Sequence, residues 1–347
     1  MYVVATAGHV DHGKSTLVRA LTGMEPDRWA EERRRGMTID LGFAWTTLPS
    51  GATLAFVDVP GHERFVPNML AGVGPVPAVL FVVAADEGWM PQSAEHLAAL
   101  DAFGVARGLL AVTRADLADP GPAAAQATAA LAGSTLADPE VVPVSAVTGA
   151  GLDRLRAALD RLVAGLPAPD PAAPVRLWID RVFTIAGSGT VVTGTLPAGT
   201  LRTGDEPLLA GGPAPPRPVR VRALQSLGRP VDVATGVARV AVNLRGVPRD
   251  EVARGAALLS PAGWGLTGEV DVRLVTGPAT GELPTQLVVH VGSAAVPARL
   301  RPLAADTARL TLRHRLPLRV GDRLLVRDPG RHQVPAGAVV LDAAPPP

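Results

Sequence analysis

Apolar runs and helical stretches alternate along the first half of the chain. Short runs of Val, Leu, Ala and Phe predict strands, and the longer stretches between them, with apolar residues at helical spacing, predict helices. The predicted strands are residues 2–7, 42–48, 53–58, 79–84, 109–113 and 141–143, and the predicted helices are residues 15–21, 92–103, 122–131 and 152–163. This alternation is typical of a doubly wound α/β domain, which binds ligands at the carboxyl ends of its strands.

The helical period disappears after residue 166. Residues 167–174 (PAPDPAAP) predict a stiff, extended linker. Beyond it, β-branched runs recur between Gly and Pro turns, at residues 190–195, 219–221, 237–242, 269–275 and 286–291. We therefore predict an α/β domain at 1–166, a linker at 167–174, and two antiparallel β-barrel domains at 175–262 and 263–347.

Residues 8–15 (GHVDHGKS) lie between the first predicted strand and the first predicted helix. They fit the pattern G-x-x-x-x-G-K-[ST], in which glycines fold the backbone round a phosphate and successive N–H groups face the anion. Lys14 would reach the outer phosphates, and the Ser15 hydroxyl would bind magnesium. The residues assigned to nucleotide binding here are Asp11, His12, Gly13, Lys14, Ser15 and Thr16. The alternative is a glycine-rich turn without a ligand.

Composition favours the phosphate loop. The chain contains 33 Lys and Arg residues, of which Lys14 alone is lysine. A compact ammonium fits among phosphates where a planar guanidinium does not, so a chance loop in this Arg-rich chain would carry Arg.

Two further stretches complete a site for phosphates and magnesium. Asp58 ends a predicted strand, where its carboxylate can hold magnesium through water, and the Gly61 N–H can sense a terminal phosphate. Thr38, within residues 35–40 (RGMTID), offers a second hydroxyl ligand for the metal.

Two stretches after later strands predict a guanine pocket. Asp116, in residues 113–116 (TRAD), can accept two hydrogen bonds from a guanine edge, and Arg114 could lie flat on the base. Thr113 begins this motif, and Ser145 with Ala146 would close the pocket through backbone N–H groups. Five such stretches in this order predict GTP and Mg²⁺ as ligands, and hence an α/β P-loop GTPase domain followed by two antiparallel β-barrel domains.

The fuller strings at residues 5–14 (ATAGHVDHGK), 35–42 (RGMTIDLG) and 58–65 (DVPGHERF) resemble the bacterial selenocysteine-specific elongation factors, the SelB family of translational GTPases. The resemblance continues through residues 179–184 (IDRVFT) and 189–195 (GTVVTGT) and covers essentially the whole chain. One departure is the guanine motif, which in the family usually reads Asn-Lys-x-Asp or Thr-Lys-x-Asp and here carries Arg114 in place of lysine.

The resemblance implies a monomeric, cytoplasmic carrier that binds selenocysteinyl-tRNA and delivers it to the ribosome with hydrolysis of GTP. His62 would orient the attacking water, and Lys14 with magnesium would stabilise the transition-state charge. Hydrolysis would collapse the loops that carry Thr38 and His62 and so release the tRNA. In the family, winged-helix domains after the barrels bind a messenger-RNA hairpin. We expect that hairpin to be bound only through an extension that is absent from this chain.

The resemblance also places Asp180, Arg181 and Arg239 in a pocket for the aminoacyl group. A selenol is ionised at neutral pH and a serine hydroxyl is not, so two guanidiniums would favour selenocysteinyl- over seryl-tRNA by charge. Asp180 would orient the two arginines. The alternative is a structural ion pair inside a barrel.

Charge is divided unevenly between the halves of the chain. Residues 1–174 contain 12 Lys and Arg against 19 Asp and Glu, whereas residues 175–347 contain 21 against 13. The basic half is expected to meet a polyanion, with the Arg clusters at 217–222 and 309–331 as candidates for RNA contact or ordinary barrel surface. Residues 31–35 (EERRR) are equally compatible with a solvated charge run and a nucleic-acid contact.

The remaining histidines of the loop, a glycine-rich turn, the length of the apolar runs and the absence of Cys each allow an interpretation. His9 and His12 are expected to pack and shape the phosphate loop, with metal binding as the alternative. The Gly-Ser-Gly at 187–189 predicts a hairpin turn. No apolar run reaches transmembrane length, so we expect no membrane partner, and the absence of Cys excludes disulfide and thiol chemistry.

Two other functions stay open: a general aminoacyl-tRNA carrier like elongation factor Tu, and the GTPase subunit of a sulfate-activating enzyme.

Overall fold

The computed structural model describes residues 1–26, 38, 40–62, 65–74, 76–212, 214–328, 330 and 333–346. The chain forms two compact units, Met1–Ala168 and Pro169–Pro347. The first unit ends two residues beyond the first predicted domain, and the division of the second half at 262/263 stays a prediction. The charge run at 31–35 lies outside the described residues, as do all members of the 35–40 string except Thr38 and Asp40.

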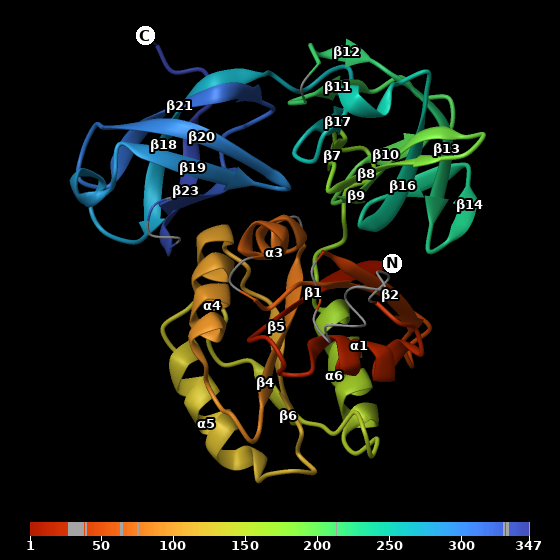
Figure 1. Ribbon diagram of the computed structural model, residues 1–347, viewed down its shortest axis with the longest axis vertical. Helices are drawn as coiled ribbons and strands as arrows, with labels where there is room; N and C mark the ends of the chain where they lie inside the picture. The colour runs from red at the N-terminus through yellow and green to blue at the C-terminus, as the bar shows by residue number, and fades with distance from the viewer. Residues whose placement is uncertain are drawn as a thin grey trace. The chain divides into compact units, whose positions relative to one another are not determined.

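The first unit is a six-stranded sheet with helices on both faces (Figure 1). The strand order is β2-β3-β1-β4-β5-β6, in which β2 runs antiparallel to β3 and the other neighbours are parallel. The strands are β1 (Tyr2–Ala7), β2 (Gly42–Thr47), β3 (Thr53–Asp58), β4 (Ala78–Ala84), β5 (Gly108–Thr113) and β6 (Glu140–Pro143). This confirms the predicted α/β fold. The parallel strands bring their carboxyl ends to one edge of the sheet.

Helices cover both faces of this sheet, so all seven residues of β4 are buried (Figure 1). The helices are α1 (Lys14–Thr22), α3 (Val66–Val73), α4 (Pro91–Phe103), α5 (Pro120–Leu131) and α6 (Leu152–Ala164). Leu17 of α1 and Leu155 of α6 share one apolar core with the sheet, and α3, α4 and α5 lie on the other face. No helix was predicted at α3, because its eight residues, VPNMLAGV, are mostly apolar, and periodicity in so short a run does not separate a helix from a strand.

The second unit begins with three antiparallel sheets around an apolar core. Their orders are β14-β13-β16-β9-β8, β12-β11-β17-β7 and β10-β15. The strands are β7 (Arg176–Trp178), β8 (Arg181–Ile185), β9 (Gly189–Leu196), β10 (Thr200–Arg202), β11 (Leu208–Ala210), β12 (Arg217–Pro218), β13 (Arg220–Ser226), β14 (Arg229–Val231), β15 (Val233–Thr235), β16 (Ala238–Arg245) and β17 (Ala257–Leu259). In β16, buried Val240, Val242 and Leu244 alternate with less buried Arg239 and Asn243, as expected for a strand with one face on a core.

The rest of the second unit is a closed six-stranded barrel in the order β18-β21-β20-β19-β22-β23. Its strands are β18 (Thr267–Thr276), β19 (Gln286–Val291), β20 (Ala294–Pro302), β21 (Thr307–Leu316), β22 (Arg323–Asp328) and β23 (Gln333–Asp342), and short 3-10 helices lie at Arg249–Glu251 and Thr280–Glu282. The predicted change from an α/β domain to antiparallel barrels is therefore confirmed. Among the described residues, no helix combines the length and apolarity needed to cross a membrane.

Two local predictions in this unit had different outcomes. The Gly-Ser-Gly turn at 187–189 joins β8 to β9 as an antiparallel hairpin, as predicted. The linker at 167–174 is not extended throughout, because the chain turns at Asp170, whose side chain accepts a hydrogen bond from the Ala172 N–H at 2.8 Å. The Asp170 carbonyl accepts another from the Gly199 N–H at 2.8 Å, which anchors the linker to the second unit.

Candidate functional site

The phosphate loop joins β1 to α1. Two of its glycines have left-handed φ angles, 128° at Gly8 and 80° at Gly13. A Cβ on Gly8 would lie 2.1 Å from the Val82 carbonyl oxygen, so β4 packs too closely against the loop for any side chain at that position. Gly13 immediately precedes α1 as its N-cap residue, and its carbonyl accepts the Leu17 N–H at 2.8 Å. The loop therefore leads directly into a helix N-terminus, where backbone N–H groups attract anions.

Lys14 is buried inside this loop. Its Nζ donates to the carbonyl oxygens of Gly8 at 2.9 Å and His9 at 2.5 Å. Burial lowers the pKa of Lys14 to about 8, against the opposing effect of the nearby Asp58 carboxylate. A Cβ on Gly61 would lie 2.4 Å from Lys14 Nζ, so the segment that follows β3 comes directly against the loop.

Three oxygen-bearing side chains meet beside the start of α1. Ser15 Oγ donates to Asp58 Oδ2 at 2.6 Å and lies 2.8 Å from Thr38 Oγ1. Thr6 Oγ1 donates to Asp58 Oδ1 at 2.7 Å and accepts the Val59 N–H at 3.0 Å, which orients the carboxylate. Hydroxyl and carboxylate oxygens are the hard ligands that magnesium prefers. The three residues assigned to the metal thus form a donor set that fits it.

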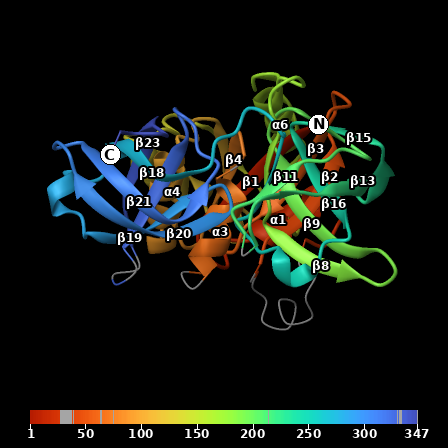
Figure 2. The ribbon, with the colours of Figure 1, turned by 90° about the horizontal axis from the view of Figure 1, so that it is seen from above.

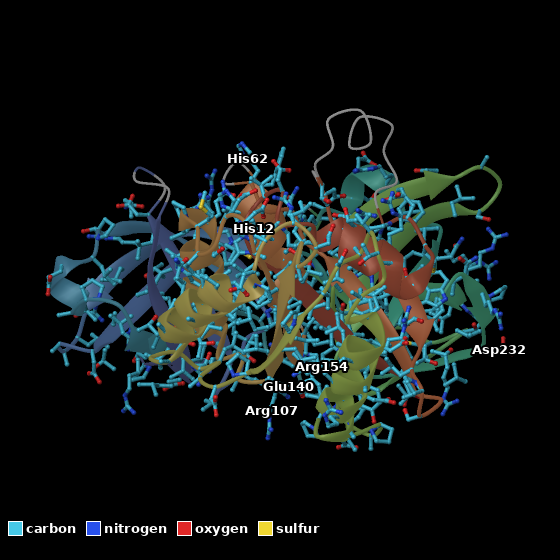
Figure 3. All side chains as sticks on the ribbon, turned by 90° about the horizontal axis from the view of Figure 1, so that it is seen from below. His12, His62, Arg107, Glu140, Arg154 and Asp232 are labelled. Atoms are coloured by element: carbon cyan, nitrogen blue, oxygen red, sulfur yellow. The ribbon has the colours of Figure 1, made fainter. Side chains whose placement is uncertain are left out.

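The histidines near the loop differ in their surroundings. His12 is fully buried, with Nδ1 3.4 Å from the Val82 carbonyl oxygen, and its ring centroid lies 5.1 Å from that of His9. Burial, and then the neighbouring His9, lowers the pKa of His12 to about 4, so the ring is neutral and packs inside the unit. His62, labelled in Figure 3, is half-buried. Its ring lies 6.0 Å from that of Phe65. Its role in orienting water stays a prediction.

Two side chains of α4 hold the phosphate loop, and neither was predicted from the sequence as part of the site. His96 Nδ1 accepts the Gly8 N–H at 3.0 Å, and Gln92 Oε1 accepts the Val10 N–H at 3.1 Å. Burial lowers the pKa of His96 well below its usual 6.5, so the ring is neutral, and the Gly8 N–H favours the tautomer in which Nδ1 is the acceptor. Gln92 and His96 are four positions apart on a predicted helix and so share one face, and this spacing was the signal available in the sequence.

The loops that follow β5 and β6 meet at the predicted base pocket. The Ala115 N–H donates to the Val144 carbonyl oxygen at 3.2 Å, which ties the two loops together. Thr113 Oγ1 donates to the His12 carbonyl oxygen at 2.7 Å and so links the base pocket to the phosphate loop. The Asp116 side chain is exposed at this edge of the sheet. Its carboxylate is therefore accessible to a base.

Arg114 connects three loops around this pocket. Its backbone is left-handed at φ 54°. Its guanidinium donates to the carboxylates of Asp86 at 2.9 Å and Glu87 at 2.6 Å, and to the Asp11 carbonyl oxygen. The side chain that replaces the usual lysine is thus held by an acidic pair, and its stacking on a base stays a prediction.

The Ser145 side of the pocket differs in one detail from what we expected. The Ser145 N–H donates to the Ala150 carbonyl oxygen at 2.9 Å, and its Oγ accepts the Thr148 N–H at 3.1 Å. These bonds shape the loop. The Ser145 N–H is therefore used within the loop, and the contact of the Ala146 N–H with a base stays a prediction.

In the second unit, Asp180 and Arg239 form a buried ion pair. The Arg239 guanidinium donates to both oxygens of the carboxylate, at 2.6 Å for the Nη2–Oδ1 contact. Thr193 Oγ1 donates to Asp180 Oδ1 at 2.8 Å and accepts from Arg239 Nη2 at 3.0 Å. The side chains of Asp180 and Arg239 are 3% and 12% exposed. This geometry matches the structural ion pair considered as the alternative, and the orienting role of Asp180 in an aminoacyl pocket stays a prediction.

Arg181 lies on the same face of the sheet as Arg239. Arg181 is opposite Thr193 across β8 and β9, and Arg239 is opposite Thr195 across β9 and β16. Thr193 and Thr195 are two positions apart on β9 and therefore point the same way, as do their cross-strand partners. Figure 2 shows these strands side by side. The structure gathers the predicted pocket residues, and their role toward an aminoacyl group stays a prediction.

Known families match both units. Residues 1–165 match the Elongation factor Tu GTP binding domain, and residues 279–347 match the beta-barrel domain of selenocysteine-specific elongation factors. The chain is 41% identical over 98% of its length to a selenocysteine-specific elongation factor of Desulfomicrobium baculatum, and 40% identical over 99% to that of Escherichia coli. A crystal structure of the bacterial selenocysteine-specific elongation factor EF-Sec matches 99% of the chain with a TM-score of 0.91 and 33% identity.

The chain spans a smaller share of the selenocysteine-specific elongation factors than of an elongation factor Tu. The chain spans 55% and 56% of the two selenocysteine-specific factors and 58% of the EF-Sec chain. It spans 95% of Elongation factor Tu 2 of Streptomyces avermitilis, to which it is 32% identical over 97% of its own length. The chain therefore belongs to the translational GTPases, in the family of the selenocysteine-specific elongation factors.

Proposed function

We propose that this protein binds selenocysteinyl-tRNA and delivers it to the ribosome in the cytoplasm, with hydrolysis of GTP. The observation that carries the proposal is the meeting of Lys14, Ser15, Thr38 and Asp58 around one phosphate loop. Relatives that match nearly the whole chain are named for selenocysteine-specific elongation, which supports the choice of aminoacyl-tRNA.

The phosphate loop would hold the nucleotide by its backbone N–H groups and by Lys14. A pKa of about 8 leaves Lys14 protonated at neutral pH, so it offers a positive charge to the outer phosphates. Ser15, Thr38 and Asp58 would hold magnesium, which supplies further positive charge to the phosphoryl group. Asp116 would accept the two donors of the guanine edge and so exclude adenine.

His62 would position the water that attacks the terminal phosphate. It directly follows Gly61, whose backbone lies against Lys14, so its segment reaches the site. Thr38 contacts Ser15, and the loops that carry Thr38 and His62 would be held while the terminal phosphate is bound. Loss of that phosphate would release both loops and, with them, the tRNA.

In the second unit, Arg181 and Arg239 would receive the selenolate of the aminoacyl group. Asp180 offsets part of the charge of Arg239 through two hydrogen bonds, and Arg181 would add positive charge on the same face of the sheet. A neutral serine hydroxyl gains little from that charge, whereas an ionised selenol gains a charge-assisted hydrogen bond. Selectivity would then be a difference in electrostatic stabilisation.

Competition between selenocysteinyl- and seryl-tRNA carrying the same tRNA tests this function. The full chain with a non-hydrolysable GTP analogue should prefer the selenocysteinyl form, and Arg181→Ala should remove most of that preference while GTP binding stays normal. Equal binding of all aminoacyl-tRNAs would instead indicate a general aminoacyl-tRNA carrier. No binding of any aminoacyl-tRNA would refute the proposal.

The hydrolytic step has its own test. His62→Ala should leave GTP affinity nearly intact and reduce ribosome-stimulated hydrolysis by at least about a hundredfold, the lower range for a positioned catalytic group. Full stimulated turnover in the variant would remove His62 from the mechanism.

A further inference from the structure

Two neighbouring carboxylates, those of Asp86 and Glu87, lie in the loop that joins β4 to α4. Arg114 Nη1 donates to Asp86 Oδ2 at 2.9 Å and to Glu87 Oε1 at 2.6 Å. The three side chains are between 29% and 34% exposed, so solvent screens their charges only in part. Adjacent carboxylates repel each other, and the guanidinium beside them offsets that repulsion. Asp86, Glu87 and Arg114 therefore form one charged unit, the Arg114 clamp.

The loop that carries the two carboxylates is fixed on both sides. The Ala85 N–H donates to the Thr113 carbonyl oxygen at 2.9 Å, which joins the loop to the end of β5. The Trp89 N–H donates to Gln126 Oε1 at 3.1 Å, which joins the loop to α5. The Trp89 ring also stacks on that of Phe81, with 5.4 Å between the centroids and 13° between the planes. The two carboxylates lie between these anchors, so the fold sets the position of their backbone.

Arg114 links the carboxylates to the phosphate loop. Its Nη2 donates to the Asp11 carbonyl oxygen, while its Nη1 meets the two carboxylates. Both residues have a left-handed backbone, with φ 54° at Arg114 and 62° at Asp11. Such conformations cost free energy in residues other than glycine, and they persist where surrounding contacts hold them. The clamp therefore holds a strained residue of the loop after β5 against a strained residue of the phosphate loop.

Glu87 has two neighbours through which it could act on the phosphate loop, Arg114 and His12. Its Oε2 lies 3.5 Å from His12 Nε2. Burial lowers the pKa of His12 to about 4, so the ring is neutral at pH 7 and the contact is not an ion pair. Arg114 is therefore the charged group through which Glu87 acts on the loop.

We propose that Asp86 and Glu87 are positioning residues that slow the release of bound guanine nucleotide. By holding the Arg114 guanidinium against the Asp11 carbonyl, they tie the loop that faces the base to the loop that faces the phosphates. A site whose parts are held together before binding loses less of its affinity to ordering, so a contact that joins the loops retains the ligand. Arginine suits this role because its planar fork binds separate partners at once, whereas lysine carries a compact point charge. The inference rests on the proposed function in taking guanine nucleotide as the ligand.

The release of a fluorescent GDP analogue from the full chain tests the proposal. Glu87→Gln keeps the size of the side chain and removes its charge. We expect release to become about fivefold faster, the upper range for a partly exposed ion pair. Release at the wild-type rate would overturn the proposal.

Glu140→Gln is the matched control. Glu140 is 35% exposed, against 34% for Glu87, and it pairs with Arg161 at 2.7 Å. It begins β6 and lies away from His12 of the phosphate loop in Figure 3. Its variant should release the nucleotide at the wild-type rate. An acceleration equal to that of Glu87→Gln would mean that loss of any such carboxylate has this effect, against the proposal.

A second background separates positioning from a general loss of stability. In Arg114→Gln the clamp is already open, so adding Glu87→Gln should accelerate release no further. Equal acceleration on both backgrounds would show that Glu87 acts without Arg114 and would contradict the proposal. Urea unfolding without nucleotide should have the same midpoint in Glu87→Gln and Glu140→Gln. A lower midpoint in Glu87→Gln alone would give this carboxylate a structural role instead.

The clamp and the base pocket can fail separately. Asp116 would read the base, so the preference for GDP over ADP should be the same in the wild type and in Glu87→Gln. A wild type without that preference would contradict the assignment of Asp116. A preference for guanine together with wild-type release from Glu87→Gln would contradict the clamp alone.

Discussion

His96 Nδ1 accepts a hydrogen bond of 3.0 Å from the Gly8 N–H, so a side chain of α4 fixes the first glycine of the phosphate loop. Gly8 cannot carry a side chain because its Cβ would lie 2.1 Å from the Val82 carbonyl oxygen. The loop is therefore held from β4 on one side and from α4 on another. Its conformation does not depend on bound phosphate alone.

The first prediction follows from this contact. His96→Ala leaves the buried Gly8 N–H without its acceptor, at a cost of about 1–3 kcal/mol, and we expect bound GDP to dissociate about tenfold faster. The measurement is the release of a fluorescent GDP analogue. His314→Ala, at an exposed histidine of β21, is the control and should not change the rate. Unchanged release from the His96 variant would show that the hydrogen bond does not support nucleotide binding.

The second prediction concerns base specificity. Asp116→Asn replaces an acceptor with an amide that suits the xanthine edge, so preference should shift from guanine toward xanthine nucleotides. Competition among GTP, xanthosine triphosphate and ATP for the wild type and the variant measures this shift. Tight binding of ATP by the wild type would contradict the assignment of the base pocket.

The third prediction concerns the ion pair of the second unit. Asp180→Ala leaves the Arg239 guanidinium buried without its partner, and we expect the free energy of unfolding to fall by about 3–5 kcal/mol. Asp180→Ala combined with Arg239→Leu should recover much of that loss, because no uncompensated charge remains. Urea unfolding of both variants gives the two values.

A control for this pair lies in the same unit. Arg217 and Glu251 also form an ion pair, but their side chains are 36% and 37% exposed. Glu251→Ala should therefore cost less than about 1 kcal/mol. Equal losses at the two pairs would mean that burial does not set the energy of the Asp180–Arg239 contact.

The fourth prediction is a pH dependence of stability. Burial, and then the nearby Arg327 and Arg254, lowers the pKa of His290 in β19 from 6.5 to about 4. The unfolded chain therefore binds a proton in the range from pH 6.5 to 4 that the folded chain does not, and the free energy of unfolding falls as the pH falls through that range. The loss attributable to His290 should reach about 2 kcal/mol by pH 5.

His290→Gln tests this assignment, because it removes one of the buried histidines with a lowered pKa and should reduce the loss of stability between pH 7 and pH 5 by that amount. Urea unfolding of the wild type and the variant at pH 7 and pH 5 provides the comparison. A pH dependence that is identical in the two proteins would show that other groups account for the acid sensitivity.

Much of the fold is encoded in short stretches of sequence. The order of strands and helices in the first unit follows from runs such as 79–84, which is apolar throughout because β4 is covered on both faces. The helix Val66–Val73 escaped detection because it has only eight residues, most of them apolar. In so short a run the spacing of apolar residues does not separate a helix from a strand.

The candidate site likewise contains residues that the sequence predicts and contacts that it does not. Gly8, Gly13 and Lys14 could be assigned from the sequence, because the loop conformation depends on residues that are neighbours in the chain. The contacts of His96 with Gly8 and of Arg114 with Glu87 could not, because they require particular elements to pack together. Spacing within α4 indicated a polar face and left its target unknown.

The sequence by itself determined the local chemistry of this protein: a phosphate loop between a strand and a helix, its single lysine, and the change from an α/β domain to β-barrels. The tertiary structure alone decided which distant residues meet. Ser15 lies against Thr38 and Asp58, and Arg220 faces Arg245, because strand register and helix packing set those distances. Backbone conformation is governed by adjacent residues, whereas register and packing depend on the whole core, and no short pattern in the chain records them.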